Sequence, residues 1–172
     1  MLCVVIDCGG TARVGVLYEG YGPHGIAFLV ETTTNNPTRT VASVRMYFNR
    51  SGGSLGTSGS VDYMFDRKAT FRISAEGHDL EELELELIDF GLDELKLDEN
   101  EIVIYAEFTE FGTMAKALED RKIEVLGAEL IRIPTVQKKL NDEQAEDIIK
   151  LIDKFEEDED VANVFTTMDM SE

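Results

Sequence analysis

Residues 69–91, ATFRISAEGHDLEELELELIDFG, decide the fold because they hold a strand, a turn and an acidic segment in sequence. Residues 69–74 are rich in β-branched and aromatic side chains, which is typical of a strand. From residue 83 to residue 87, leucine alternates with glutamate as in a strand, but Asp79 can cap a helix and Gly91 can end one. The length of the segment favours a helix.

The elements that follow this stretch complete a βαββαβ series that ends at residue 133. A hairpin is predicted from residues 95–97 and 101–108, a short helix capped by Thr113 from residues 113–122, and a strand from residues 128–133. The rest of the chain repeats the series, with strands predicted at 25–34, 61–65, 136–140 and 161–168 and helices at 37–51 and 142–157. We therefore predict an α+β fold of two nested ferredoxin-like βαββαβ units, each an antiparallel sheet with helices on one face.

This nesting predicts the domain boundaries. Residues 18–68 and 135–172 would form a discontinuous first domain, residues 69–134 an inserted second domain, and residues 1–17 a short N-terminal segment. Both helices of the first domain have an asparagine at the capping position, Asn36 and Asn141. Their buried faces are predicted from apolar residues at helical spacing: Val41, Val44 and Phe48 in the first helix, and Ala145, Ile148, Ile149, Ile152 and Phe155 in the second.

The charge of the chain is unevenly distributed. The net charge is −19, yet residues 1–74 hold seven Lys/Arg against five Asp/Glu, whereas residues 75–172 hold nine against thirty. Because Lys and Arg bind phosphate backbones by displacing counterions, any contact with nucleic acid is expected in the first half. The acidic half is expected to be a solvated surface, with docking on a basic protein partner as the alternative.

Several classes of protein are not supported by the sequence. No apolar run reaches the ~18 residues of a membrane span, and Asp7 interrupts the apolar start, so no membrane contact or secretory signal is expected and a cytoplasmic location is predicted. Cys3 and Cys8 are predicted to be free thiols, with a disulfide or half of a metal site as alternatives. With two histidines and no nucleophile elbow or HExxH motif, we expect no enzyme, no cofactor and no metal.

Residues 18–25, YEGYGPHG, combine three glycines and a proline with two tyrosines and a histidine. Downstream, basic residues are interleaved with aromatic ones, and Arg39 and Arg50 lie eleven residues apart, almost three helical turns, so they should project together. Such a combination can bind phosphate and stack on unpaired bases. The alternative is a plain hairpin turn with the aromatic rings in the core, which we favour for Tyr63 and Phe71.

Three stretches resemble a known family: YEGYGPHGIAFLVE (18–31), TNNPTRTVASVR (34–45) and GGSLGTSGSVDYMFDRK (52–68). They closely resemble the YebC family, which includes the mitochondrial translational activator of cytochrome c oxidase. The resemblance implies a non-enzymatic probable transcriptional regulator that binds DNA, or alternatively a ribosome-associated translation factor acting on proline-rich nascent chains. It also implies a basic helical N-terminal domain followed by two nested α+β domains. Residues 1–17 do not resemble that helical domain, so we expect it to be missing, and His24 stands where many members have glycine.

The resemblance and the residue pattern together predict one surface for DNA or ribosomal RNA. Its predicted residues are Tyr18, Gly20, Tyr21, Gly22, Pro23, His24, Gly25, Arg39, Arg50, Gly52, Gly53, Gly56, Ser58, Arg67 and Lys68. A protein-interaction module that uses the acidic half is the remaining alternative.

Overall fold

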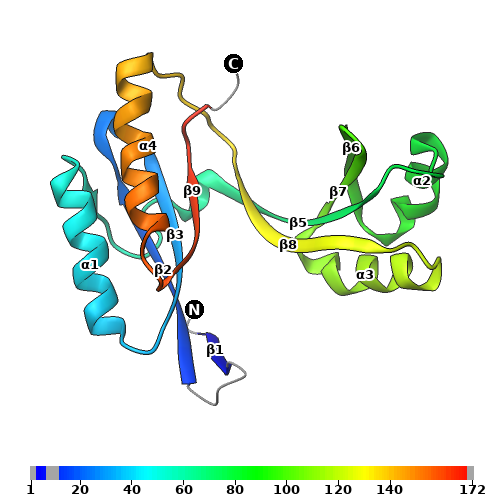
Figure 1. Cartoon of the computed structure of the whole chain (residues 1–172), viewed down its shortest axis with the longest axis horizontal. Helices are drawn as coiled ribbons and strands as arrows, with labels where there is room; N and C mark the ends of the chain where they lie inside the picture. The colour runs from blue at the N-terminus through cyan, green and yellow to red at the C-terminus, as the bar shows by residue number, and fades with distance from the viewer. Residues whose placement is uncertain (1–2, 7–11, 170–172) are drawn as a thin grey trace. The chain divides into compact units, whose positions relative to one another are not determined.

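The chain divides into two compact units in the computed structural model, which describes residues 12–169 and the backbone of residues 3–6. Residues 1–65 and 134–172 form the first unit, and residues 66–133 form the second. Each unit has its own sheet and its own pair of helices (Figure 1). The predicted free thiols of Cys3 and Cys8 lie outside the described parts of the chain.

The sheet of the first unit is antiparallel, with strands in the order β1-β2-β3-β9, and β4 pairs with one end of β2. Its strands are β1 (Cys3–Ile6), β2 (Ala12–Tyr21), β3 (Ala27–Thr34), β4 (Ser54–Leu55) and β9 (Val161–Thr166). Two helices, α1 (Pro37–Arg50) and α4 (Asp142–Glu156), pack beside each other against it, as Figure 1 shows. Two short 3₁₀ turns, η1 (Pro23–Gly25) and η2 (Asp62–Met64), complete the unit.

The first unit has a hydrophobic cluster on each face of this sheet, because successive strand residues point to opposite sides. On the helix side, the rings of Phe28, Phe48 and Phe155 meet with centroids 5.1 to 6.1 Å apart. On the other side, Leu29 packs with Val61 and Phe65. The chain that follows β4 therefore covers the face that no helix covers.

The second unit is a four-stranded antiparallel sheet with strand order β6-β7-β5-β8 and two helices. Its elements are β5 (Phe65–Ser74), α2 (Leu80–Leu87), η3 (Ile88–Phe90), β6 (Leu92–Asp98), β7 (Glu101–Glu107), η4 (Phe108–Glu110), α3 (Phe111–Asp120) and β8 (Val125–Pro134). Phe71, Ile104 and Leu118 are among the buried residues of a core that shares no member with the clusters of the first unit.

The α+β class is confirmed, as are the antiparallel sheets and the βαββαβ order of residues 65–134. The ambiguous acidic segment is a helix, and Asp79 accepts hydrogen bonds from the backbone N–H groups of Glu81 and Glu82. Asn36 and Asn141 cap α1 and α4 as predicted.

Five predictions about the elements are wrong. Asp62–Met64 form η2 instead of a strand, Phe65 begins β5, and residues 136–140 make only an isolated bridge between Lys138 and Met168. The first sheet is completed instead by β2, where no strand was predicted. Thr113 does not cap α3, which begins two residues earlier. On α4, Ile149 is 46% exposed and Leu151 occupies the buried face.

Candidate nucleic-acid interface

Residues 18–25 form the end of β2 and the turn η1. Tyr18 is only 9% exposed and belongs to the helix-side core, where burial first and the charge of Asp160 second raise the pKa of its hydroxyl. Tyr21 is half-buried on the other face, and burial, followed by its contact with the Tyr63 hydroxyl, raises its pKa. Tyr18 is therefore placed to pack, not to stack on a base.

The two remaining aromatic predictions have opposite outcomes. Tyr63 is 71% exposed, so the prediction that it lies in the core is wrong, because it falls in η2 and not in a strand. Phe71 is 1% exposed, as predicted, and stacks on Phe111 with centroids 5.0 Å apart.

The glycines of this region allow backbone segments to approach closely. A Cβ atom on Gly53 would lie 2.2 Å from the carbonyl oxygen of Tyr21, and one on Gly20 would lie 2.6 Å from that of Ser54. These two glycines let β4 pair with β2. The predicted residues Gly22, Gly25, Gly52 and Gly56 lie in the turns around this contact, and Ser58 is exposed in the loop that follows.

Glu19, which was not among the predicted residues, holds that loop in place. Its side chain is 3% exposed and accepts hydrogen bonds from the backbone N–H groups of Gly59, Val61 (3.0 Å) and Asp62 (2.7 Å). The donors are backbone N–H groups that lie 40 or more residues away in the sequence. Because residues of almost any type carry such a group, the sequence could not have predicted this contact.

His24 connects η1 to α4. Its backbone has a φ of 60°, and its Nε2 atom lies 2.9 Å from Oδ2 of Asp147. Lys138 adds a second connection by donating through Nζ to the carbonyl oxygen of His24 at 2.7 Å. The turn that follows Tyr21 is thereby fixed against α4, with Pro23 at its first position.

Arg39 is engaged inside the first unit. Its Nη2 atom lies 2.8 Å from Oδ2 of Asp160, a carboxylate that is 7% exposed and also accepts from the Thr40 hydroxyl at 2.9 Å. Burial alone would raise the pKa of Asp160, but hydrogen bonds from Arg39, Thr40 and Thr34 outweigh it and bring the pKa below its usual value. Arg39 therefore ties the start of α1 to the residue that precedes β9.

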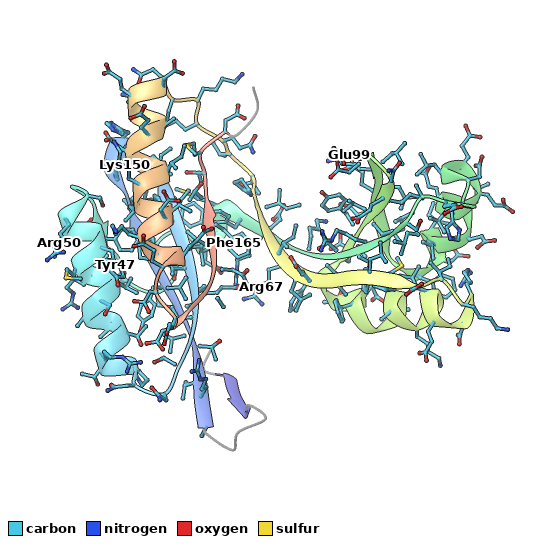
Figure 2. All side chains as sticks on the ribbon, in the orientation of Figure 1. Tyr47, Arg50, Arg67, Glu99, Lys150 and Phe165 are labelled. Atoms are coloured by element: carbon cyan, nitrogen blue, oxygen red, sulfur yellow. The ribbon has the colours of Figure 1, made fainter. Side chains whose placement is uncertain are left out.

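Arg50 lines a groove between α1 and α4 with a volume of about 790 Å³. Figure 2 shows Tyr47 and Arg50 on α1 and Lys150 on α4. The lining residues are Tyr47, Arg50 and Ser51 from the α1 side, and Asp147, Lys150, Leu151, Lys154 and Glu157 from the α4 side. Lys154 pairs with Glu157 at 2.8 Å and Lys150 with Glu146 at 3.5 Å, whereas Arg50 makes no ion pair with any residue between 12 and 169.

The whole of α1 is basic, with three arginines and no Asp or Glu. Arg45, which was not predicted, lines a second hollow of about 420 Å³ on the outer face of the helix with Met46, Asn49 and Arg50. Within the described chain, Arg45 also makes no ion pair. The absence of carboxylates from residues 37–50 is the sequence signal that could have identified Arg45.

Arg67 and Lys68 lie in the second unit, on β5, so the predicted residues are divided between two units. Nζ of Lys68 lies 2.8 Å from Glu107 and 3.1 Å from Asp93, and the hydrogen bond to Glu107 raises the pKa of Lys68 most. The guanidinium of Arg67 lies 5.2 Å from the centre of the Phe108 ring. Lys68 is therefore neutralised, and the groove of the first unit is the better candidate site.

The His, Cys, Asp and Glu side chains of the described residues form no group of three that could hold a metal ion. No helix among them has the length and apolar character needed to cross a membrane.

These observations define an α+β protein of two units, one inserted in the other, with a basic helix in the first. Residues 14–168 match the family model described as the second and third domain of TACO1/YebC. The chain therefore belongs to the TACO1/YebC family.

Relatives of known name support this assignment. The chain is 56% identical over 153 residues to a probable transcriptional regulatory protein of Flavobacterium psychrophilum, covering 89% of this chain and 65% of that one. It is 57% identical over 152 residues to one of Porphyromonas gingivalis, covering 88% and 63%. The chain thus spans less than two thirds of the length of these relatives, whose names describe regulatory proteins and not enzymes.

A solved structure has the same fold. The crystal structure of a conserved hypothetical protein from Aquifex aeolicus superposes with a TM-score of 0.80 at 32% identity, over 96% of this chain and 69% of that one.

Proposed function

We propose that this chain acts in a regulator of gene expression and binds nucleic acid through the groove between α1 and α4 and the outer face of α1. The observation that carries the proposal is the basic character of α1, which has three arginines and no carboxylate in a chain of net charge −19. The names of the relatives, probable transcriptional regulatory proteins, support the regulatory role.

The lining of the groove suits a phosphate backbone. Arg50 supplies a cation without an ion pair among the described residues, and Lys150 and Lys154 add two that are already paired with Glu146 and Glu157. The two lining carboxylates are already engaged, Asp147 by His24 and Glu157 by Lys154. Guanidinium groups bind phosphate in a bidentate way, so Arg50 is the expected anchor. Tyr47 adds an aromatic wall, although its hydroxyl donates to Asp158 at 3.0 Å, and burial raises its pKa.

The proposal is tested by measuring fluorescence anisotropy of labelled nucleic acid with the variant Arg45→Ala/Arg50→Ala/Lys150→Ala. We expect the dissociation constant to rise by at least about tenfold and the slope of log K against log salt to fall by about 2 to 3, since each lost phosphate contact removes about 0.9 for duplex DNA. The matched control, Lys116→Ala/Lys122→Ala in the second unit, removes exposed cations away from the groove and should change affinity by less than about twofold.

Two probes at equal salt separate the possible targets. A promoter duplex tests the transcriptional role, and a folded RNA with unpaired loops tests the role in translation. Equal loss of affinity in the triple variant and in the control would show that the groove is not the binding surface. Failure of the parent to bind either probe would refute the proposal for this chain.

A further inference from the structure

The outer face of α2 exposes apolar side chains that no described residue covers. Leu85 is 75% exposed and Ile88 is 58% exposed, while Leu83 and Leu87 on the opposite side of the helix are buried. Single exposed apolar residues are ordinary on a protein surface, but neighbouring ones rimmed by charge are typical of interaction sites. Leu85 and Ile88 lie three residues apart and so are neighbours on the helix surface.

Carboxylates surround these two side chains. Glu81 precedes Leu85 by four residues and Glu84 precedes Ile88 by four, so each apolar side chain has a glutamate one turn before it. Neither glutamate makes an ion pair among the described residues, whereas Glu86 on another side of the helix is paired with Arg121 at 3.1 Å. The helix itself has four glutamates and no Lys or Arg.

A further exposed apolar side chain lies on a neighbouring strand, beside the start of α2. Leu97 is 57% exposed on β6, an edge strand that pairs with β7 on one side. It lines a groove of about 450 Å³ together with Leu80 and Glu81 from the start of α2. We call this surface the α2 face, and its residues are Glu81, Glu84, Leu85, Ile88 and Leu97.

Leu85 and Ile88 contribute little to the stability of the isolated unit, because a side chain that is mostly exposed gains little from burial. Glu81 and Glu84 also repel each other at helical spacing. We propose that the α2 face is a docking site for a basic amphipathic segment of a partner protein, one that presents apolar side chains flanked by Lys or Arg. Apolar contact with Leu85 and Ile88 would be combined with ion pairing at Glu81 and Glu84.

Charge complementarity selects this occupant over others. Phosphates of nucleic acid and anionic lipid head groups would be repelled by Glu81 and Glu84, which lack compensating cations. A second copy of the chain, paired symmetrically through the same face, would bring these glutamates against their own counterparts. The second unit as a whole carries nineteen Asp/Glu against eight Lys/Arg, so it also attracts a cationic partner from a distance.

The test uses two fluorescein-labelled synthetic peptides of about 15 residues, a length at which an isolated helix is marginal. One places Leu and Lys at amphipathic helical spacing, and the other has the same composition in an order without an apolar face. Fluorescence anisotropy is measured with the parent chain and with two α2-face variants, Leu85→Ser/Ile88→Ser and Glu81→Gln/Glu84→Gln. All the replaced side chains are exposed, and thermal unfolding checks that the variants fold.

Matched controls remove the same chemistry elsewhere. Leu126→Ser/Leu130→Ser replaces exposed leucines of β8, and Glu143→Gln/Glu156→Gln replaces exposed carboxylates of α4. We expect each α2-face variant to weaken binding of the amphipathic peptide by at least about tenfold and each control to change it by less than about twofold. The parent should bind the reordered peptide at least about tenfold more weakly than the amphipathic one.

Three results would overturn the proposal: no binding of the amphipathic peptide, equal binding of both peptides, or equal loss in the controls. Sedimentation of the parent and of Leu85→Ser/Ile88→Ser examines self-association. A parent dimer that this variant dissociates would make a second copy the occupant and would also refute the proposal. These experiments test only the second unit. They do not decide the nucleic-acid proposal, which concerns the first unit.

Discussion

Glu19 places a carboxylate inside the first unit with backbone N–H groups as its partners. Both oxygens are used, one by Gly59 and the other by Val61 and Asp62. Hydrogen bonds to an ionised acceptor are stronger than neutral ones, so a single side chain can fix the course of a glycine-rich loop. The loop in turn positions Val61 and Phe65 against the sheet.

We predict that Glu19→Gln lowers the free energy of unfolding by about 2 to 4 kcal/mol, because the amide nitrogen would face the N–H of Gly59 and leave it without an acceptor. Urea denaturation measures the loss, and amide hydrogen exchange should show faster exchange at Gly59, Val61 and Asp62. Asp66→Asn, at an exposed position, should change stability by less than about 0.5 kcal/mol. Unchanged exchange in the loop would contradict this role of Glu19.

His24 combines a left-handed backbone with a side-chain contact to Asp147, and its substitutions separate the two effects. His24→Gly relieves a φ of 60° but loses the contact with Asp147 and gains chain entropy in the unfolded state. These effects nearly cancel, so we predict a stability within about 0.5 kcal/mol of the parent. His24→Val keeps the strained backbone with a β-branched side chain and should lose about 1 to 3 kcal/mol, measured by thermal unfolding. Equal stability of the two variants would show that the left-handed backbone is not strained.

At the scale of elements, the start of α1 depends on the buried carboxylate of Asp160. Arg39, Thr40 and Thr34 all donate to it, and their effect on its pKa exceeds the opposing effect of burial. Because the folded-state pKa of Asp160 lies below its unfolded value, the carboxylate stabilises the fold above the unfolded pKa. That contribution is lost as the pH falls through the folded-state pKa.

We predict that Asp160→Asn costs about 1 to 3 kcal/mol at neutral pH, since the charge-assisted hydrogen bonds become neutral ones. The difference in stability between parent and variant should stay constant down to about pH 4 and shrink below it, near the unfolded pKa of an aspartate. Urea denaturation at a series of pH values measures this difference, and the exposed Asp153→Asn is the control. A difference that grows on acidification would contradict the assigned direction.

The elements that the sequence predicted well are those with local causes. Asn36 and Asn141 cap their helices through N–H groups three residues away, so the signal lies within one turn. The strands were harder, because their pairing is nonlocal: β2 pairs with β3 and β4, and residues 136–140 have strand-like composition but make only one bridge. The candidate site was predicted only in part, because some of its residues come together through nonlocal packing. Arg50 followed from helical spacing, whereas Lys150 became part of the site only when α4 packed beside α1.

At the scale of the whole chain, the second unit is inserted where two segments of the first unit meet. The backbone N–H of Thr135 donates to the carbonyl oxygen of Met64 at 2.8 Å, so the chain leaves and re-enters the first unit at adjacent points. The buried clusters of the two units have no residue in common. An insertion with adjacent ends and a separate core is expected to fold as an independent domain.

We therefore predict that residues 66–133 fold alone, and that residues 1–65 joined to 134–172 by a short Gly-Ser linker also fold. The inserted unit is close to the size at which single domains become marginal, so its stability should depend on residues such as Leu118, which is fully buried. Leu118→Ala should lower the stability of the fragment by about 2 to 5 kcal/mol. Amide dispersion in NMR spectra and cooperative urea transitions report folding of both pieces.

Phe155→Ala, in the core of the first unit, should destabilise the linked piece by about 3 to 5 kcal/mol. In the intact chain, the same substitution should leave the stability of the second unit unchanged. An unfolded fragment, or a single transition of the intact chain that both substitutions shift equally, would show that the units depend on each other for their stability.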